Sequence, residues 1–481
     1  MSHRLRAADN LVVPSNFIRA ARESGYISLS TALAELVDNS LQAGASDVAI
    51  SINRPIKGVW PQIQVEDNGE GMDRAKLASC LRFGGSSRFD ERTSFGRFGM
   101  GLPAASVSQA RKVEVVAWQA GQPARSVMLD VDEIAAGMPV DLAPRPAGSA
   151  PTSSGCRVVW YQCDRVEYRR LAWLERALHR DLGRIYRRFL SGDLRLTIND
   201  MPVQPVDPTL LTTKVEGRTA QPAFDTLRYE VATASGDTAF VTVRFTILPV
   251  HAWHHLDNVT KRQVGIVGHG GVTILRAGRE IAIGWHLMGS KRKENYDDWW
   301  RCEIEFDPVL DEHFGITINK QGIRPSAALR DAIEPELESI ARMLNSRVRQ
   351  AFEEVKFKAA AAESCRIATA TDADLPAIKG RGRARGPLNY SIGSAPMPAE
   401  TMFRSRLKHR TLDVTLNIDH PAFAALYHPL TAMEDAAATK LRTAIELFLL
   451  SFARTALLMG RETDEMLRIW SATYGRMVQR S

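Results

Sequence analysis

Apolar and polar residues alternate with the two-residue period of a β-strand in several separate parts of the chain. These alternating segments lie at 62–66, 194–200, 240–247, 271–276 and 412–423. Apolar residues spaced three or four positions apart predict helices instead. Segments with this helical spacing lie at 31–41, 326–352, 432–459 and 462–478. We therefore expect a protein in which strands and helices are mixed along the chain.

The predicted helix at 31–41 has one apolar and one polar face. Its apolar stripe consists of Leu33, Leu36, Val37 and Leu41. Glu35 and Asn39 are four residues apart, so both side chains point from one side of the helix. A carboxylate there can accept a proton from an attacking water, and an amide oxygen one turn on can help hold a Mg²⁺ ion that also binds phosphate. Alone, such a pair is usually a solvated helix face.

A glycine-rich turn follows the alternating segment at 62–66. It begins at Asp67 and reads Asp-Asn-Gly-Glu-Gly-Met, so that Gly69, Gly71 and Met72 lie within it. Glycine lets a flat ring approach the backbone closely, and a buried carboxylate can accept a hydrogen bond from an exocyclic amine. These properties favour adenine, although an ordinary turn is the alternative interpretation.

A second glycine-rich segment, at 96–101, precedes the predicted start of a helix at 104–107. It reads Gly-Arg-Phe-Gly-Met-Gly. Its backbone N–H groups, with the helix N-terminus, could cradle phosphates. It lacks the Lys-Ser/Thr ending of a Walker loop and the preceding strand of a dinucleotide fold. What makes it informative is its position after the Glu-Asn helix and the Asp-Gly turn.

These three segments, in this order, resemble the GHKL ATPases, the superfamily of DNA gyrase B, the ninety-kilodalton heat-shock chaperones, MutL and the histidine kinases. The resemblance implies an α+β Bergerat fold, with helices on a mixed sheet and ATP and Mg²⁺ under a mobile lid. It implies that Glu35 is the general base, Asn39 the Mg²⁺ ligand and Asp67 the adenine reader. Glu35 favours hydrolysis, because histidine kinases carry an Asn-rich version of this helix and pass phosphate to a His.

The resemblance also assigns the remaining nucleotide contacts. Gly69, Gly71 and Met72 would line the base pocket. The residues of the phosphate lid would be Ser86, Ser87, Gly96, Arg97, Phe98, Gly99, Met100 and Gly101. The lid most resembles that of MORC-type ATPases and their prokaryotic relatives, some of which act in defence systems. In the fourth box of the superfamily, Cys156 follows Gly155 where Thr is usual, which puts the hydroxyl contact to adenine in question.

The strands and helix between 194 and 352 resemble the transducer domain, of the ribosomal-S5-like type, that follows the ATPase domain in gyrase- and MutL-like members. The transducer signature is a lysine that reaches back to the γ-phosphate, and Lys320 lies where that loop belongs. An ammonium group there would stabilise charge in the transition state. A surface lysine in a loop is the alternative.

Length and composition suggest several domains. At 481 residues the chain suits about three domains of roughly 150 residues. We expect an ATPase domain at 1–190, a transducer at 191–356, a flexible basic linker at 357–400 and a mostly helical region at 401–481. No apolar run of membrane-spanning length and no signal peptide are found. The five cysteines lack paired metal spacing, which predicts a reducing cytoplasm and no structural zinc.

The charge balance bears on partners. The formal net charge is +7, with basic clusters at 180–189 and 379–387. Such clusters can hold phosphodiester backbones without reading sequence, but they are also common in solvated tethers. No helix-turn-helix, zinc finger or RNA-binding signature accompanies them. His420, in an Asn-x-x-His-Pro segment, is interpreted as a turn or cap residue.

Two functions of different classes fit these features. The first is an ATP-driven clamp that forms a homodimer on binding ATP and closes on double-stranded DNA. The second is a chaperone-like remodeller, or a scaffold, that acts on a partner protein subunit. Stimulation of ATP turnover by DNA would separate them.

Overall fold

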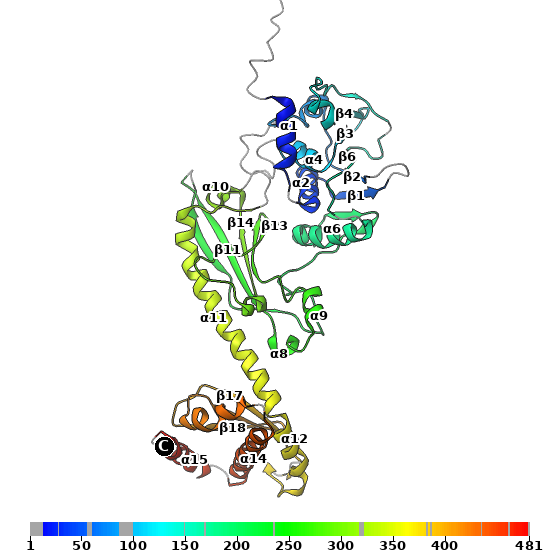
Figure 1. Ribbon diagram of the computed structural model, residues 1–481. Coiled ribbons are helices and arrows are strands. Elements are labelled where there is room, and N and C mark those ends of the chain that lie inside the picture. The colour runs from blue at the N-terminus through cyan, green and yellow to red at the C-terminus, as the bar shows by residue number, and fades with distance from the viewer. Residues whose placement is uncertain are drawn as a thin grey trace, which may run out of the picture. The chain divides into compact units, whose positions relative to one another are not determined.

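The computed structural model forms two compact units, which we describe separately (Figure 1). The first comprises Met1–Pro249 and His255–Leu344, and the second Val250–His254 and Asn345–Ser481. The structure describes residues 13–26, 28–54, 60–85, 100–148, 150–167, 170–233, 236–316, 322–380, 383–384, 387–433, 435–459 and 462–479. Among the described helices, none combines the length and apolar character needed to cross a membrane.

The first unit begins with a mixed sheet in the order β5-β4-β3-β6-β2-β1-β7-β8. Its strands are β1 (Asp47–Asn53), β2 (Gln62–Asp67), β3 (Lys112–Trp118), β4 (Arg125–Asp130), β5 (Arg145–Pro146), β6 (Gly155–Tyr161), β7 (Arg195–Ile198) and β8 (Met201–Pro202). β1 and β7 are parallel, and the other neighbours are antiparallel. The strand expected at 194–200 is β7, and it extends this sheet rather than the second one.

Helices cover the buried face of this sheet. They are α1 (Pro14–Glu23), α2 (Leu29–Gln42), α4 (Gly101–Gln109) and α6 (Leu171–Ile185), with the shorter α3 (Arg74–Ser79), α5 (Val131–Ala135) and α7 (Arg187–Leu190). Ile63 and Val65 of β2 point into the core shared with these helices, whereas Gln64 and Glu66 are half-buried. This helices-on-sheet arrangement confirms the α+β fold that the resemblance implies.

A second sheet in the same unit has the order β10-β11-β14-β12-β13, with β9 paired to β11. The strands are β9 (Gln221–Pro222), β10 (Leu227–Ala232), β11 (Thr238–Ile247), β12 (Gly271–Arg276), β13 (Arg279–Gly284) and β14 (Trp300–Phe306). The helix α11 (Ala327–Ala360) packs its apolar face, including Leu329, Ile333 and Leu337, into the core of this sheet. The short helices α9 (Asn258–Gln263) and α10 (Asp311–Phe314) belong to this unit, whereas α8 (Val250–Trp253) belongs to the second unit. The strands expected at 240–247 and 271–276 are present as β11 and β12.

The second unit contains a three-stranded sheet in the order β17-β19-β18 and several helices. The strands are β17 (Asn389–Ala395), β18 (Phe403–Lys408) and β19 (Thr411–Asn417), with a separate hairpin of β15 (Lys379–Gly380) and β16 (Arg383–Ala384). The helices are α12 (Ala362–Thr371), α13 (His428–Ala432), α14 (Ala436–Met459) and α15 (Glu462–Val478). The helix expected at 462–478 is thus present with the expected bounds.

The segment 357–400, expected as a flexible linker, is ordered over much of its length. It contains α12 and β17, and Tyr390 and Ile392 lie in the core of the second unit. Asp372 is buried, and its Oδ1 lies 2.6 Å from Nε of Arg454 on α14. The alanine-rich part of this segment forms the helix α12, and the residues after the basic run form the strand β17.

His420 is a buried structural residue of the second unit. Its Nδ1 accepts a hydrogen bond from the N–H of Ala422 at 3.1 Å, and its Nε2 lies 3.1 Å from the carbonyl oxygen of Ser471. The ring therefore fastens the turn after β19 to α15, which agrees with its interpretation as a turn or cap residue.

Candidate active site

The helix α2 carries two of the expected site residues. Its N-terminus is closed by a capping box in which Ser28 Oγ accepts a hydrogen bond from Thr31 N at 3.2 Å. Glu35 is only 3% exposed, and Asn39 is half-buried. Burial, together with the hydrogen-bonded Glu35, raises the pKa of Tyr26. Tyr26 therefore stays protonated and can donate its hydroxyl hydrogen to the Glu35 carboxylate.

The Glu35 carboxylate lies against the N-terminus of α4. A Cβ atom added at Gly101 would overlap Glu35 Oε1 and would lie 2.7 Å from Glu35 Cδ. Met100 is the N-cap residue, and Gly101 is the first residue of the helix. The first N–H groups of a helix have no intrahelical acceptor and favour negative charge. Because residue 101 has no side chain, a helix end suited to phosphate can lie beside the carboxylate.

Asp67 is held at the end of β2 by hydrogen bonds to its carboxylate, among them one from the backbone of Cys156. Its Oδ2 accepts from Ser40 Oγ at 2.8 Å, and its Oδ1 accepts from Gly69 N at 2.9 Å. Burial raises the pKa of Asp67, whereas the bonds from Gly69 and Ser40 act in the opposite direction. Since Ser40 belongs to α2, the same helix holds Asp67 and carries Glu35.

The glycines near Asp67 are required by close backbone packing. Gly71 has φ +70°, and a Cβ atom there would overlap the carbonyl oxygen of Trp118. A Cβ atom at Gly69 would lie 2.8 Å from the Cβ of Ala43. Met72, the next residue, packs partly against the core. The spacing of these glycines therefore has a structural reason in addition to the base-pocket role that the resemblance implies.

Cys156 lies opposite Asp67 in the pairing of β2 with β6. Burial and the Asp67 carboxylate raise the pKa of the Cys156 thiol well above its usual value. At neutral pH the side chain is therefore a neutral thiol, which is a weak hydrogen-bond donor. The position that usually holds Thr does adjoin Asp67, with a thiol in place of the hydroxyl.

Three buried residues near the site were missed by sequence reasoning. Asp38, on α2 beside Asn39, is completely buried. Its Oδ1 accepts a hydrogen bond from the Tyr186 hydroxyl at 2.7 Å and lies 3.2 Å from Nε of Arg279 on β13. The Asp38 charge raises the pKa of Arg279 against the effect of its burial. The only signal in the sequence was a charged residue within an apolar stretch of the helix.

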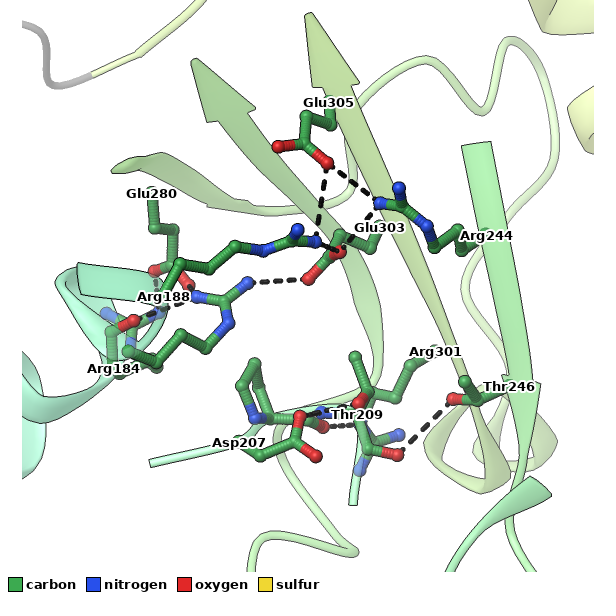
Figure 2. A network of polar contacts seen from close by, with 12 residues as sticks. Arg184, Arg188, Asp207, Thr209, Arg244, Thr246, Glu280, Arg301, Glu303 and Glu305 are labelled. Carbon is green, nitrogen blue, oxygen red and sulfur yellow. Dashed lines mark hydrogen bonds and ion pairs between the residues drawn. The ribbon is translucent and has the colours of Figure 1, made fainter. Parts of the chain in front are cut away.

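A larger ion network joins the first sheet's helices to the second sheet (Figure 2). Glu280 pairs with Arg184 and with Arg187, the latter at 2.8 Å. Glu303 pairs with Arg187 at 2.7 Å and also with Arg188. Arg244 and Glu305 extend the network. Within the basic cluster at 180–189, Arg184 and Arg187 pair with acids distant in the sequence, and Arg188 pairs in the same way although it is exposed.

Several expected site residues lie outside the described residues. They are Ser86, Ser87, Gly96, Arg97, Phe98, Gly99 and Lys320. The base of the Lys320 loop is described: the N–H of Arg324 lies 2.9 Å from the carbonyl oxygen of Phe314 and 3.1 Å from that of Gly315. Backbone hydrogen bonds therefore hold the two described ends of this loop next to each other.

The donor set fits a Mg²⁺ ion bound together with phosphate. No group of three or more His, Cys, Asp or Glu side chains suited to a metal occurs in the described part of the chain. Mg²⁺ usually keeps several waters and takes one or two protein ligands alongside substrate phosphates. The amide oxygen of Asn39, one helical turn from Glu35, can supply such a ligand.

Comparison with known proteins agrees with this geometry. Residues 27–149 match the family model of the histidine kinase-, DNA gyrase B- and HSP90-like ATPases. Protein MICRORCHIDIA 7 of Arabidopsis thaliana is 29% identical over 121 residues, covering 24% of this chain and 17% of that protein. Protein MICRORCHIDIA 3 of the same plant is 30% identical over 105 residues, covering 21% and 16%. The match thus spans about a sixth of these relatives, and it confirms the resemblance of the N-terminal domain to GHKL and MORC ATPases.

Proposed function

We propose that this chain is an ATP-hydrolysing molecular clamp of MORC type and that double-stranded DNA is its cargo. The observation that carries the proposal is a buried carboxylate, Glu35, placed against the N-terminus of α4 at Gly101. The same helix holds Asp67 through Ser40. One helix therefore contributes to both the phosphate end and the adenine end of the proposed site.

The proposed chemistry is general-base hydrolysis. Glu35 takes a proton from the water that attacks the γ-phosphate, and the Tyr26 hydroxyl holds the carboxylate in place. The N-terminal N–H groups of α4 and the ammonium group of Lys320 compensate the charge that develops on the phosphate. A bound Mg²⁺ ion, with Asn39 as a protein ligand, would neutralise phosphate charge. Asp67 accepts a hydrogen bond from the amino group of adenine.

The proposed clamp motion requires a connection from the nucleotide to the rest of the unit. The ion pair of Asp38 with Arg279 supplies one, because it joins α2 to the second sheet. In the proposal, ATP orders the lid, two ATPase domains associate, and hydrolysis separates them. The formal net charge of +7 supports a DNA cargo.

A protein cargo is the alternative function, in a chaperone-like remodeller or a scaffold for a partner subunit. The internal pairing of Arg184, Arg187 and Arg188 favours it, since it reduces the basic surface available to DNA. We would compare ATP turnover with and without duplex DNA at low and moderate salt, and measure molar mass by light scattering with and without ATP. The DNA clamp predicts salt-sensitive stimulation by duplex and an ATP-dependent dimer. Turnover that is indifferent to DNA contradicts the DNA cargo, and a mass that is indifferent to ATP contradicts the clamp.

A further inference from the structure

The three-stranded sheet of the second unit has one apolar and one polar face. Tyr390, Ile392, Leu412, Val414 and Leu416 lie in the core together with residues of α14. On the edge strand β18, Arg404, Arg406 and Lys408 are all exposed and occupy alternate positions. Because successive side chains of a strand point to opposite faces, these three cations share the polar face.

These cations are available for an external anion. In the part of the chain that the structure describes, no ion pair joins Arg404, Arg406 or Lys408 to an acid. Asp413 on β19 is directly opposite Arg406 and is half-buried. It is the only carboxylate among the described residues of β17, β18 and β19, so three positive charges face one negative charge. The excess of positive over negative charge on this face contrasts with the 180–189 cluster, where acidic side chains pair with Arg184, Arg187 and Arg188.

A fourth cation lies at the end of the same hairpin. Arg410 is exposed, and its Nη2 and Nε donate to the carbonyl oxygen of Pro387 at 2.6 and 3.2 Å. Pro387 lies two residues before the start of β17, whose Asn389 pairs with Thr411. Arg410 thus adds a fourth exposed cation at the end of the sheet where the chain approaches β17.

The rest of the polar face carries small side chains. Its positions on β17 and β19 are Asn389, Ser391, Gly393, Ala395, Thr411, Asp413, Thr415 and Asn417, of which Asn417 is buried. Hydroxyl and amide groups of this kind commonly donate to phosphate oxygens. Aromatic side chains, which would stack on the bases of a single strand, are absent from these described positions.

We infer that this face, with Arg404, Arg406, Lys408 and Arg410, binds the sugar-phosphate backbone of a nucleic acid duplex without reading its bases. The inference rests on the proposed DNA cargo and names the surface that would contact it. Alternate residues of a strand are about 6.8 Å apart, which matches the rise of about two phosphates along one DNA strand. A line of cations with this spacing suits an extended polyanion better than a single phosphate, which needs converging donors.

The test compares two triple variants of the full chain that lose the same charge. The first is Arg404→Gln, Arg406→Gln and Lys408→Gln. The matched control is Arg366→Gln, Lys440→Gln and Arg476→Gln, three exposed cations on α12, α14 and α15. Binding of a labelled duplex of mixed sequence is measured by fluorescence anisotropy across a salt series, with free inorganic phosphate as a competitor. ATP turnover without DNA and circular dichroism are recorded for each protein.

The face variant is expected to bind duplex about tenfold more weakly or worse at low salt, with a slope of log K against log salt reduced by about 2.7, since each phosphate contact contributes about 0.9. The control should bind like the wild type, and millimolar phosphate should not compete. Equal losses in both variants, or none in the face variant, overturn the assignment of the surface. A wild type that hydrolyses ATP but binds no duplex also overturns it, and points to an acidic protein partner. Duplex binding through this face without ATP turnover would instead contradict the proposed ATPase.

Discussion

Arg279 of β13 and Asp38 of α2 form a buried ion pair, with Nε 3.2 Å from Oδ1, between residues 241 positions apart. Asp38 lies directly before Asn39 and three residues after Glu35. The second sheet is therefore fastened to the helix that carries the proposed base and the proposed Mg²⁺ ligand. Any displacement of β13 relative to α2 must break this pair or move that helix.

Replacing Arg279 by Met should destabilise the first unit by about 3 kcal/mol, because a buried carboxylate loses its cationic partner. The hydrogen bond from the Tyr186 hydroxyl to Asp38 remains in this variant. The free energy of unfolding in urea measures the effect. In the double variant Arg279→Met with Asp38→Leu, no buried charge is left unpaired, so much of the stability should return. A double variant as unstable as the sum of the single variants would contradict a direct pair.

Replacing Gly101 by Ala should lower ATP turnover at least tenfold. The added Cβ would overlap Glu35 Oε1, so the carboxylate must move, and small displacements of a catalytic group can cost as much as about a hundredfold in rate. Gly148→Ala is the matched control, since a Cβ there meets nothing within 4 Å. Steady-state hydrolysis and thermal unfolding are measured together. Normal turnover in Gly101→Ala would show that Glu35 does not act from the position described.

Replacing Asp67 by Asn should weaken ATP binding while leaving the apo protein as stable or more stable at neutral pH. Burial raises the pKa of Asp67, so its ionised form costs stability above that pKa. Asn can still accept from Gly69 N and donate to Ser40 Oγ. As the pH falls from the raised pKa of Asp67 in the folded protein to below its ordinary pKa in the unfolded chain, the stability difference should vanish. Titration calorimetry with ATP and with GTP measures the loss of nucleotide binding, and unfolding as a function of pH measures the change in stability. An unchanged preference for ATP over GTP would contradict the proposed role of Asp67 in binding adenine.

The sequence was sufficient to predict those helices and strands whose pattern involves only neighbouring residues. The alternation at 62–66 and the apolar stripe at 31–41 predicted elements that the structure contains, and the helix at Glu462–Val478 appears with the expected bounds. Each of these signals depends on residues within a few positions of one another. The resemblance of three glycine- and acid-containing segments to those of the GHKL ATPases implied the fold of the N-terminal domain.

The sequence did not predict which distant segments of the chain pair with one another. The segment at 194–200 has the alternation of a strand, but nothing in it shows that it pairs with β1. Arg187 looked like a surface cation because its partners, Glu280 and Glu303, are 93 and 116 residues away. The sequence did not indicate the role of Arg279 for the same reason, because its partner Asp38 lies on α2, far away in the sequence. Charge becomes informative about partners only when the acids that neutralise it are known.

The most direct test of the account is the comparison of wild type with Glu35→Gln for ATP binding and for single-turnover hydrolysis. Gln keeps the size of the side chain and can still interact with Tyr26, but it cannot accept a proton from water at neutral pH. We predict ATP affinity within about threefold of the wild type and hydrolysis reduced by about a hundredfold or more, since general-base catalysis contributes roughly 10²–10⁴-fold. Hydrolysis at the wild-type rate in Glu35→Gln would contradict the assignment of the base and, with it, the central claim about how this site works.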